Sequence, residues 1–112
     1  MTIAISSTGN GWDSPIDERF GRAHGFFLVD EENGQTRYLD NAANLDAGHG
    51  AGPASVQLLV NAGVGAIVTG RVGPKAEDAL QAAHIVVFEP GHAHTVREAW
   101  DSYRQHKQQP SS

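Results

Sequence analysis

Cysteine is absent from this chain of 112 residues. Disulfide bridges are therefore excluded, and so are iron–sulfur and zinc sites that depend on thiolate ligands. A metal centre bound by this sequence has to use histidine, carboxylate or backbone groups, or it has to arrive with its own sulfide ligands.

Long apolar runs and an excess of positive charge are missing as well. No run approaches the ~18 apolar residues needed to cross a bilayer, and residues 1–6 lack the basic segment that opens a secretory signal. We therefore expect a cytoplasmic protein with no membrane partner. The chain has 8 Lys and Arg against 13 Asp and Glu, a net charge of −5. Nucleic-acid-binding domains usually show a basic patch, so no nucleic-acid partner is expected.

The apolar pattern predicts five strands and three helices in the order β-β-β-α-β-α-β-α. The first helix is expected to start at Pro53, with Val56, Leu59 and Val60 on its core face, and to end at Gly63. The second helix is expected to start at Pro74. The third should follow a Thr-Val-Arg-Glu capping box at residues 95–98. The strands are expected at residues 2–6, 26–29, 36–39, 66–69 and 85–88.

Short connections and right-handed crossovers favour one arrangement of these strands. The first three form an antiparallel meander, and the last two lie parallel to strand one on its free side, giving the order 3-2-1-4-5. This is a mixed α/β sheet flanked by helices, like the ribonuclease-H core. We expect a single domain over residues 1–104, a flexible tail over 105–112, and loops at 7–24 and 41–52 with few apolar anchors.

One edge of this predicted sheet has the features of an anion site. Strands one, three, four and five all end there, and so three helix starts meet at the same edge, at Pro53, Pro74 and Val96. Free N–H groups and the positive end of the helix dipole favour anions at such positions. The basic and histidine side chains assigned to the same edge are Arg19, Arg22, His24, His49, Arg71, His92 and His94.

Each of these side chains also has a simpler interpretation. Arg19 and Arg22 can clamp a ligand, or they can pair with nearby carboxylates while Phe20 fills the core. His49 can bind ligand or metal, or it can be an exposed loop histidine. His92 and His94 are a weak metal pair without a third ligand, and His24 can cap the second strand.

Several motifs resemble the dinitrogenase iron–molybdenum cofactor biosynthesis family, over about residues 2–104. Departures from the family pattern are Arg71 where Asn is common, His49 where a small residue is common, and Pro53 where Ile is common. The matching motifs are Asp13-Ser14-Pro15, Arg19-Phe20-Gly21-Arg22-Ala23, Gly50-Ala51-Gly52, Thr69-Gly70-x-Val72-Gly73-Pro74 and Thr95-Val96-Arg97-Glu98-Ala99.

The resemblance implies a ribonuclease-H-like domain that holds a metal–sulfur cluster, as in NifX-like carriers, the C-terminal domain of NifB-like proteins and orange proteins of sulfate reducers. A cysteine-free, stand-alone chain is closest to the orange-protein type. The cluster would be a molybdenum–copper sulfide or an iron–molybdenum cofactor precursor, bound non-covalently and exchanged with donor and acceptor proteins. The expected ligand contacts are Arg19, Phe20, Gly21, Arg22, His24, His49, Gly50, Gly52, Gly70, Arg71 and Gly73, with His49, His92 and His94 as possible metal contacts.

Catalysis is not expected. A ribonuclease-H nuclease needs carboxylates on its central strands to hold two metal ions, and residues 2–6 and 66–69 contain none. No nucleophile–base–acid set stands out either. The sequence predicts a carrier for a molybdenum- or iron-containing metal–sulfur cluster. The alternative is a regulatory or scaffold module that binds a simple oxyanion or a protein partner.

Overall fold

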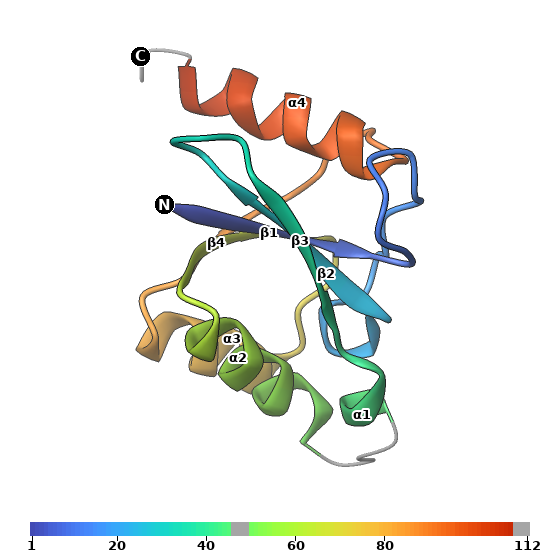
Figure 1. Ribbon diagram of the computed structural model, residues 1–112. Coiled ribbons are helices and arrows are strands. Elements are labelled where there is room, and N and C mark those ends of the chain that lie inside the picture. The colour runs from blue at the N-terminus through green and yellow to red at the C-terminus, as the bar shows by residue number, and fades with distance from the viewer. Residues whose placement is uncertain (46–49, 109–112) are drawn as a thin grey trace.

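The computed structural model describes residues 1–45 and 50–108. One five-stranded sheet runs through the molecule in the order β3-β2-β1-β4-β5, as the sequence predicts (Figure 1). The strands are β1 (Thr2–Ser7), β2 (Gly25–Asp30), β3 (Thr36–Asp40), β4 (Val64–Val68) and β5 (Val86–Phe88). The helices are η1 (Phe20–Arg22), α1 (Ala42–Leu45), α2 (Ala51–Asn61), α3 (Pro74–Ala82) and α4 (Val96–Gln108).

The central strand β1 separates two hydrophobic cores. It pairs antiparallel with β2 and parallel with β4, and its residues Ile3, Ala4 and Ile5 are all fully buried. Successive side chains of a strand point to opposite faces. Ile3 and Ile5 therefore pack toward α4, whereas Ala4 packs toward α2 and α3 on the other face (Figure 1).

The α4 face confirms the predicted capping box. The Glu98 N–H donates to the Thr95 hydroxyl over 3.2 Å, and the Thr95 N–H donates to the Glu98 carboxylate over 3.2 Å. The loop after β1 is better anchored than expected, because Trp12 lies 4.8 Å from the Phe27 ring and Ile16 packs on the same core. The expectation of few apolar anchors in residues 7–24 is therefore wrong.

On the opposite face, α2 begins at Ala51, two residues before the predicted start. Gly50 has a φ of 87°, which glycine adopts without strain, and Pro53 is tolerated in the first turn because its missing N–H would have no helical partner there. The prediction for Val60 is wrong, since 43% of it is exposed. It lies about 100° around the helix from the buried Leu59.

Two short elements were not predicted. The η1 turn buries Phe20 against Phe26, with ring centroids 5.5 Å apart, and α1 follows directly after β3.

Helix α4 continues beyond the predicted boundary at residue 104, while residues 109–112 lie outside the described part. The division into domain and tail stays a prediction. Within the described ranges, no helix has the length and apolar character to span a membrane.

Candidate functional site

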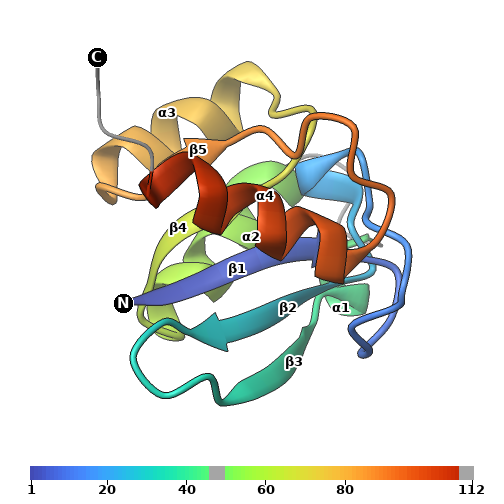
Figure 2. The same ribbon diagram turned by 90° about the horizontal axis from the view of Figure 1, so that it is seen from above.

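A pocket of about 580 Å³ opens at the edge of the sheet where β1 and β4 end. Figure 2 shows the loop after β1, the η1 turn and the segment leading into α3 on the side toward which β1 runs. Three segments far apart in the sequence build the pocket. Its lining residues are Arg19, Gly21, Arg22, Gly50, Ala51, Gly52, Pro53, Arg71, Gly73, Pro74, Lys75 and Ala76.

The pocket carries positive charge although the protein is acidic. Four of the eight Lys and Arg residues of the chain line it, and no acidic residue is among the lining residues. All four are exposed, and within residues 1–45 and 50–108 none of their side chains makes an ion pair or hydrogen bond. These four cations are Arg19, Arg22, Arg71 and Lys75.

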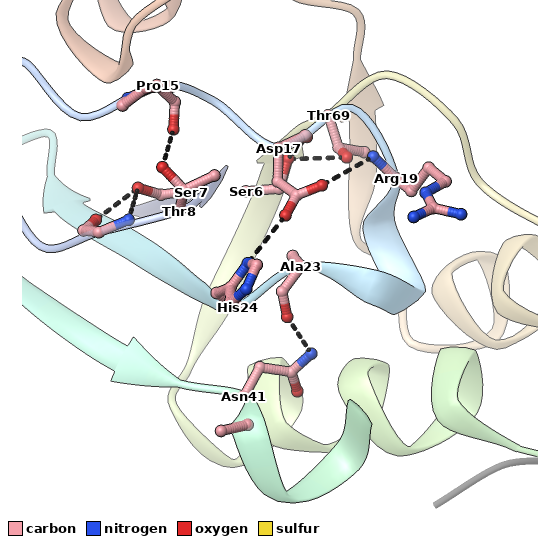
Figure 3. Close-up of polar contacts among 12 residues, drawn as sticks. Ser6, Ser7, Thr8, Pro15, Asp17, Arg19, Ala23, His24, Asn41 and Thr69 are labelled. Carbon is pink, nitrogen blue, oxygen red and sulfur yellow. Dashed lines mark hydrogen bonds and ion pairs between the residues drawn. The ribbon is translucent and has the colours of Figure 1, made fainter. Parts of the chain in front are cut away.

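The nearby carboxylates have other partners. Asp17 accepts from the His24 ring nitrogen Nδ1 over 3.4 Å and from the Arg19 backbone N–H over 3.3 Å (Figure 3). Asp13 lies 3.3 Å from the Arg97 guanidinium. The interpretation in which these acids pair with the pocket arginines is therefore wrong for the side chains that the structure describes.

Two helix starts, not three, face the pocket. The first N–H groups of any helix have no helical partner. In α2 and α3 the N-cap residues are Gly50 and Gly73, which make no side-chain cap. The first N–H groups of α4, in contrast, donate to acceptors within the protein. Its Val96 N–H donates to the Ser14 carbonyl over 2.9 Å, and Thr95 closes the capping box. The prediction that this third start belongs to the site is wrong.

A short backbone bridge fixes two of the cations. Arg19 and Arg71 form an isolated parallel bridge, in which the Phe20 N–H donates to the Arg71 carbonyl over 2.8 Å and the Arg71 N–H donates to the Glu18 carbonyl. Gly70 is required at this bridge, because a Cβ there would stand 2.6 Å from the Glu18 oxygen.

Close glycine contacts bring the three segments together. A Cβ on Gly21 would lie 3.2 Å from the Gly52 Cα, and a Cβ on Gly52 would lie 2.9 Å from the Ala76 Cβ. These distances are shorter than ordinary carbon–carbon contacts of about 3.5–4.0 Å. Any side chain at either position would push the η1 turn, α2 and α3 apart.

A buried amide behind the pocket ties the same segments together by hydrogen bonds. Asn41 Nδ2 donates to the Ala23 carbonyl over 2.9 Å (Figure 3). It also donates to the Ser55 hydroxyl over 3.1 Å, and Asn41 Oδ1 accepts from Asn44 over 2.8 Å. Asn41 is 1% exposed and Ser55 is fully buried. This residue therefore links the end of the η1 turn to the first turns of α2.

A second hollow of about 410 Å³ lies across the backbone bridge and shares Arg19 and Arg71 with the pocket. Its other lining residues include Asp17 and Glu18, so its charge is mixed. The buried Ser6 hydroxyl beneath this region is 2.7 Å from the Asp17 carbonyl and 2.9 Å from the Thr69 hydroxyl (Figure 3). These bonds hold the loop after β1 against β4.

The structure brings together most of the residues singled out from the sequence. Phe20 lies in the core, and Gly70 packs on the backbone of Glu18. His24 and the pair His92 and His94 are not among the pocket-lining residues. The predicted site residues that do line the pocket are Arg19, Gly21, Arg22, Gly50, Gly52, Arg71 and Gly73.

The predicted metal ligands do not converge in the part of the chain that is described. No group of three or more His, Asp or Glu side chains there can hold a metal ion, so His92 and His94 have no third partner. His49 lies outside the described residues. Lys75 was missed from the sequence, and its position next to the predicted helix start at Pro74 was the available signal.

The model of the dinitrogenase iron–molybdenum cofactor family matches residues 1–106. The chain belongs to this family. An uncharacterised family relative from Methanocaldococcus jannaschii is 35% identical over 92 residues, which are 80% of this chain and 74% of the relative.

Two solved structures support the membership in this cofactor family. The apo form of the orange protein from Desulfovibrio gigas is 42% identical with a TM-score of 0.90, over 99% of this chain and 92% of that one. A NifB-like protein from Thermotoga is 35% identical with a TM-score of 0.82, over 93% of this chain and 87% of the other. The predicted fold, including the strand order, is confirmed by the match to the orange protein.

Proposed function

We propose that this protein is a carrier that binds a molybdenum- or iron-containing metal–sulfur cluster without covalent ligation, and that it does not transform its cargo. The observation that carries the proposal is a set of four basic side chains around one pocket of an acidic protein, none of which pairs with another residue in the described part of the chain. Membership in the iron–molybdenum cofactor family points to the same class of ligand.

The chemistry of the described lining fits a cluster that is already complete. Guanidinium groups, an ammonium group and the backbone N–H groups at the helix starts donate hydrogen bonds, and the sulfides of an anionic cluster accept them. Each hydrogen bond to a charged group contributes about 1.5–3 kcal/mol. None of the lining residues in the described part is a histidine or carboxylate that would ligate a metal directly, so the cluster would keep its own sulfide ligands.

The proposed contacts follow from the lining. Arg19, Arg22 and Arg71 supply charge, and the starts of α2 and α3 supply N–H groups. His49 precedes Gly50, which lines the pocket, and stays a candidate metal or sulfide contact. The pocket is open at its rim, which suits exchange of the cluster with donor and acceptor proteins.

Anaerobic titration with tetrathiomolybdate and copper(I) tests this proposal. We expect a new visible charge-transfer band, and backbone NMR shifts confined to residues 19–22, 50–53 and 71–76. Arg22→Gln should weaken binding, whereas Arg104→Gln removes one positive charge from α4 outside the pocket and should not.

Three outcomes of this titration would contradict the carrier proposal. If the protein gives no band and no shifts with this probe, and none with an iron-containing sulfide cluster either, it is not a cluster carrier. Tight binding of molybdate or phosphate alone would favour the oxyanion-binding regulatory module. Equal loss of binding in both arginine variants would mean that net charge, and not the pocket, attracts the anion.

A further inference from the structure

Neither the backbone conformation at Gly73 nor a contact with another described residue requires a glycine there. Its φ of −70° and ψ of 164° are ordinary for any residue, and a Cβ added there would meet no described residue within 4 Å. The other glycines of the pocket differ. Gly50 needs its positive φ, and Gly21 and Gly52 are close to neighbouring atoms.

Gly73 also occupies a position where a side chain would stabilise the fold. It is the N-cap of α3, in the extended backbone conformation in which Ser, Asn or Asp caps a helix. A serine oxygen there would accept from the N–H of Lys75 or Ala76. The sequence leaves both groups without a cap at the wall of the pocket.

Lys75, like Gly73, is not the residue that would make the start of α3 most stable. It lies in the first turn of α3, where the positive end of the helix dipole favours Asp or Glu and disfavours a cation. Its side chain is exposed, lines the pocket and makes no ion pair with another described residue. Both departures become favourable when an anion sits at this helix start.

We propose that Gly73 and Lys75 set the size and charge of the cargo. The anionic cluster rests against the Gly73 Cα, in the space that a side chain would fill, and accepts from the N–H groups of Lys75 and Ala76 in place of a cap. The Lys75 ammonium neutralises it from the rim. This inference rests on the proposed function, and it assigns the contact point within the pocket.

The test uses three variants of the full chain, Gly73→Ala, Gly73→Ser and Lys75→Glu. Each should leave the thermal unfolding midpoint of the empty protein unchanged or raised, because alanine restricts the unfolded chain, serine caps α3 and glutamate suits the dipole. Each should weaken binding of tetrathiomolybdate with copper(I) roughly tenfold to a hundredfold, the loss expected for one charge-assisted contact.

Two comparisons sharpen the result. Gly11→Ala is the matched control, since its Cβ would make an ordinary 3.6 Å contact with Ser14 outside the pocket, and it should bind as the unaltered protein does. Tetrathiomolybdate alone is smaller than the copper-containing cluster. Gly73→Ala should therefore weaken its binding less than it weakens binding of the larger cluster.

The outcomes separate the inference from the proposed function. Unchanged binding by Gly73→Ala and Gly73→Ser overturns the inference and leaves the carrier function standing. Weaker binding that comes with a lower unfolding midpoint also overturns it, because the residue would then act through the fold. An unaltered protein that binds neither probe overturns both.

Discussion

Replacing Asn41 by alanine should loosen the wall of the pocket and lower the stability of the fold. The side chain makes hydrogen bonds to Ala23, Ser55 and Asn44. After the change, Ser55 keeps its 2.8 Å bond to the Ala51 carbonyl. The fully buried Ala23 carbonyl loses its side-chain donor.

The loss in free energy of unfolding can be estimated from these hydrogen bonds. A buried carbonyl left without a partner costs about 1–3 kcal/mol, and the space left by the amide adds roughly 1 kcal/mol. We expect the free energy of unfolding to fall by about 2–4 kcal/mol. For a domain of this length, 1 kcal/mol shifts the melting temperature by roughly 4 °C, so the loss amounts to about 8–16 °C.

Urea denaturation followed by tryptophan fluorescence measures this loss. Asn44→Ala is the matched control, because Asn44 donates to the same amide but is only half-buried and can reach water. It should cost less than about 1 kcal/mol. If Asn41→Ala costs no more than Asn44→Ala, the buried amide does not hold the η1 turn to α2, and the reasoning is refuted.

Two further predictions concern the backbone bridge and the start of α4. Gly70→Ala should cost about 1–3 kcal/mol in urea denaturation, because its Cβ would stand 2.6 Å from the Glu18 carbonyl; a loss as small as that of Gly11→Ala would contradict this. The His94 N–H donates to the Glu98 carboxylate and lowers its pKa below the ordinary 4.5. Glu98 therefore stabilises the fold above pH ~4.5, and this contribution is lost as the pH falls through the lowered pKa. Melting temperatures across the acid range should fall less steeply in Glu98→Gln than in the unaltered protein, and parallel curves would count against the capping role.

The sequence predicts the sheet well because its strands are short apolar runs separated by clear turn and cap signals. Residues such as Ile3 and Ile5 alternate with small side chains, and the capping box over residues 95–98 indicates the start of the last helix. Once the strands and helices are placed, the handedness of crossovers leaves little choice of topology. The edge where the arginines gather follows from that topology.

The errors have physical causes that sequence spacing does not contain. His92 and His94 are expected at the site because strand five ends at the same edge, but hydrogen bonds from Ile16 to His94 and from Val96 to Ser14 join their loop to the α4 face. The sequence also does not distinguish glycines that the fold requires from glycines that it does not. Gly70 and Gly73 stand in one motif, yet the first is required by a backbone contact with Glu18 and the second by no contact among the described residues.

The parallel bridge between Arg19 and Arg71 joins positions that are distant in the chain through main-chain atoms alone. Main-chain hydrogen bonds do not depend on which side chains occupy the bridged positions. Substitution at either arginine can therefore change the charge and reach of the rim while the frame around it persists. The rim residues can therefore diverge in evolution, and the ligand preference of the pocket with them, while the fold stays the same.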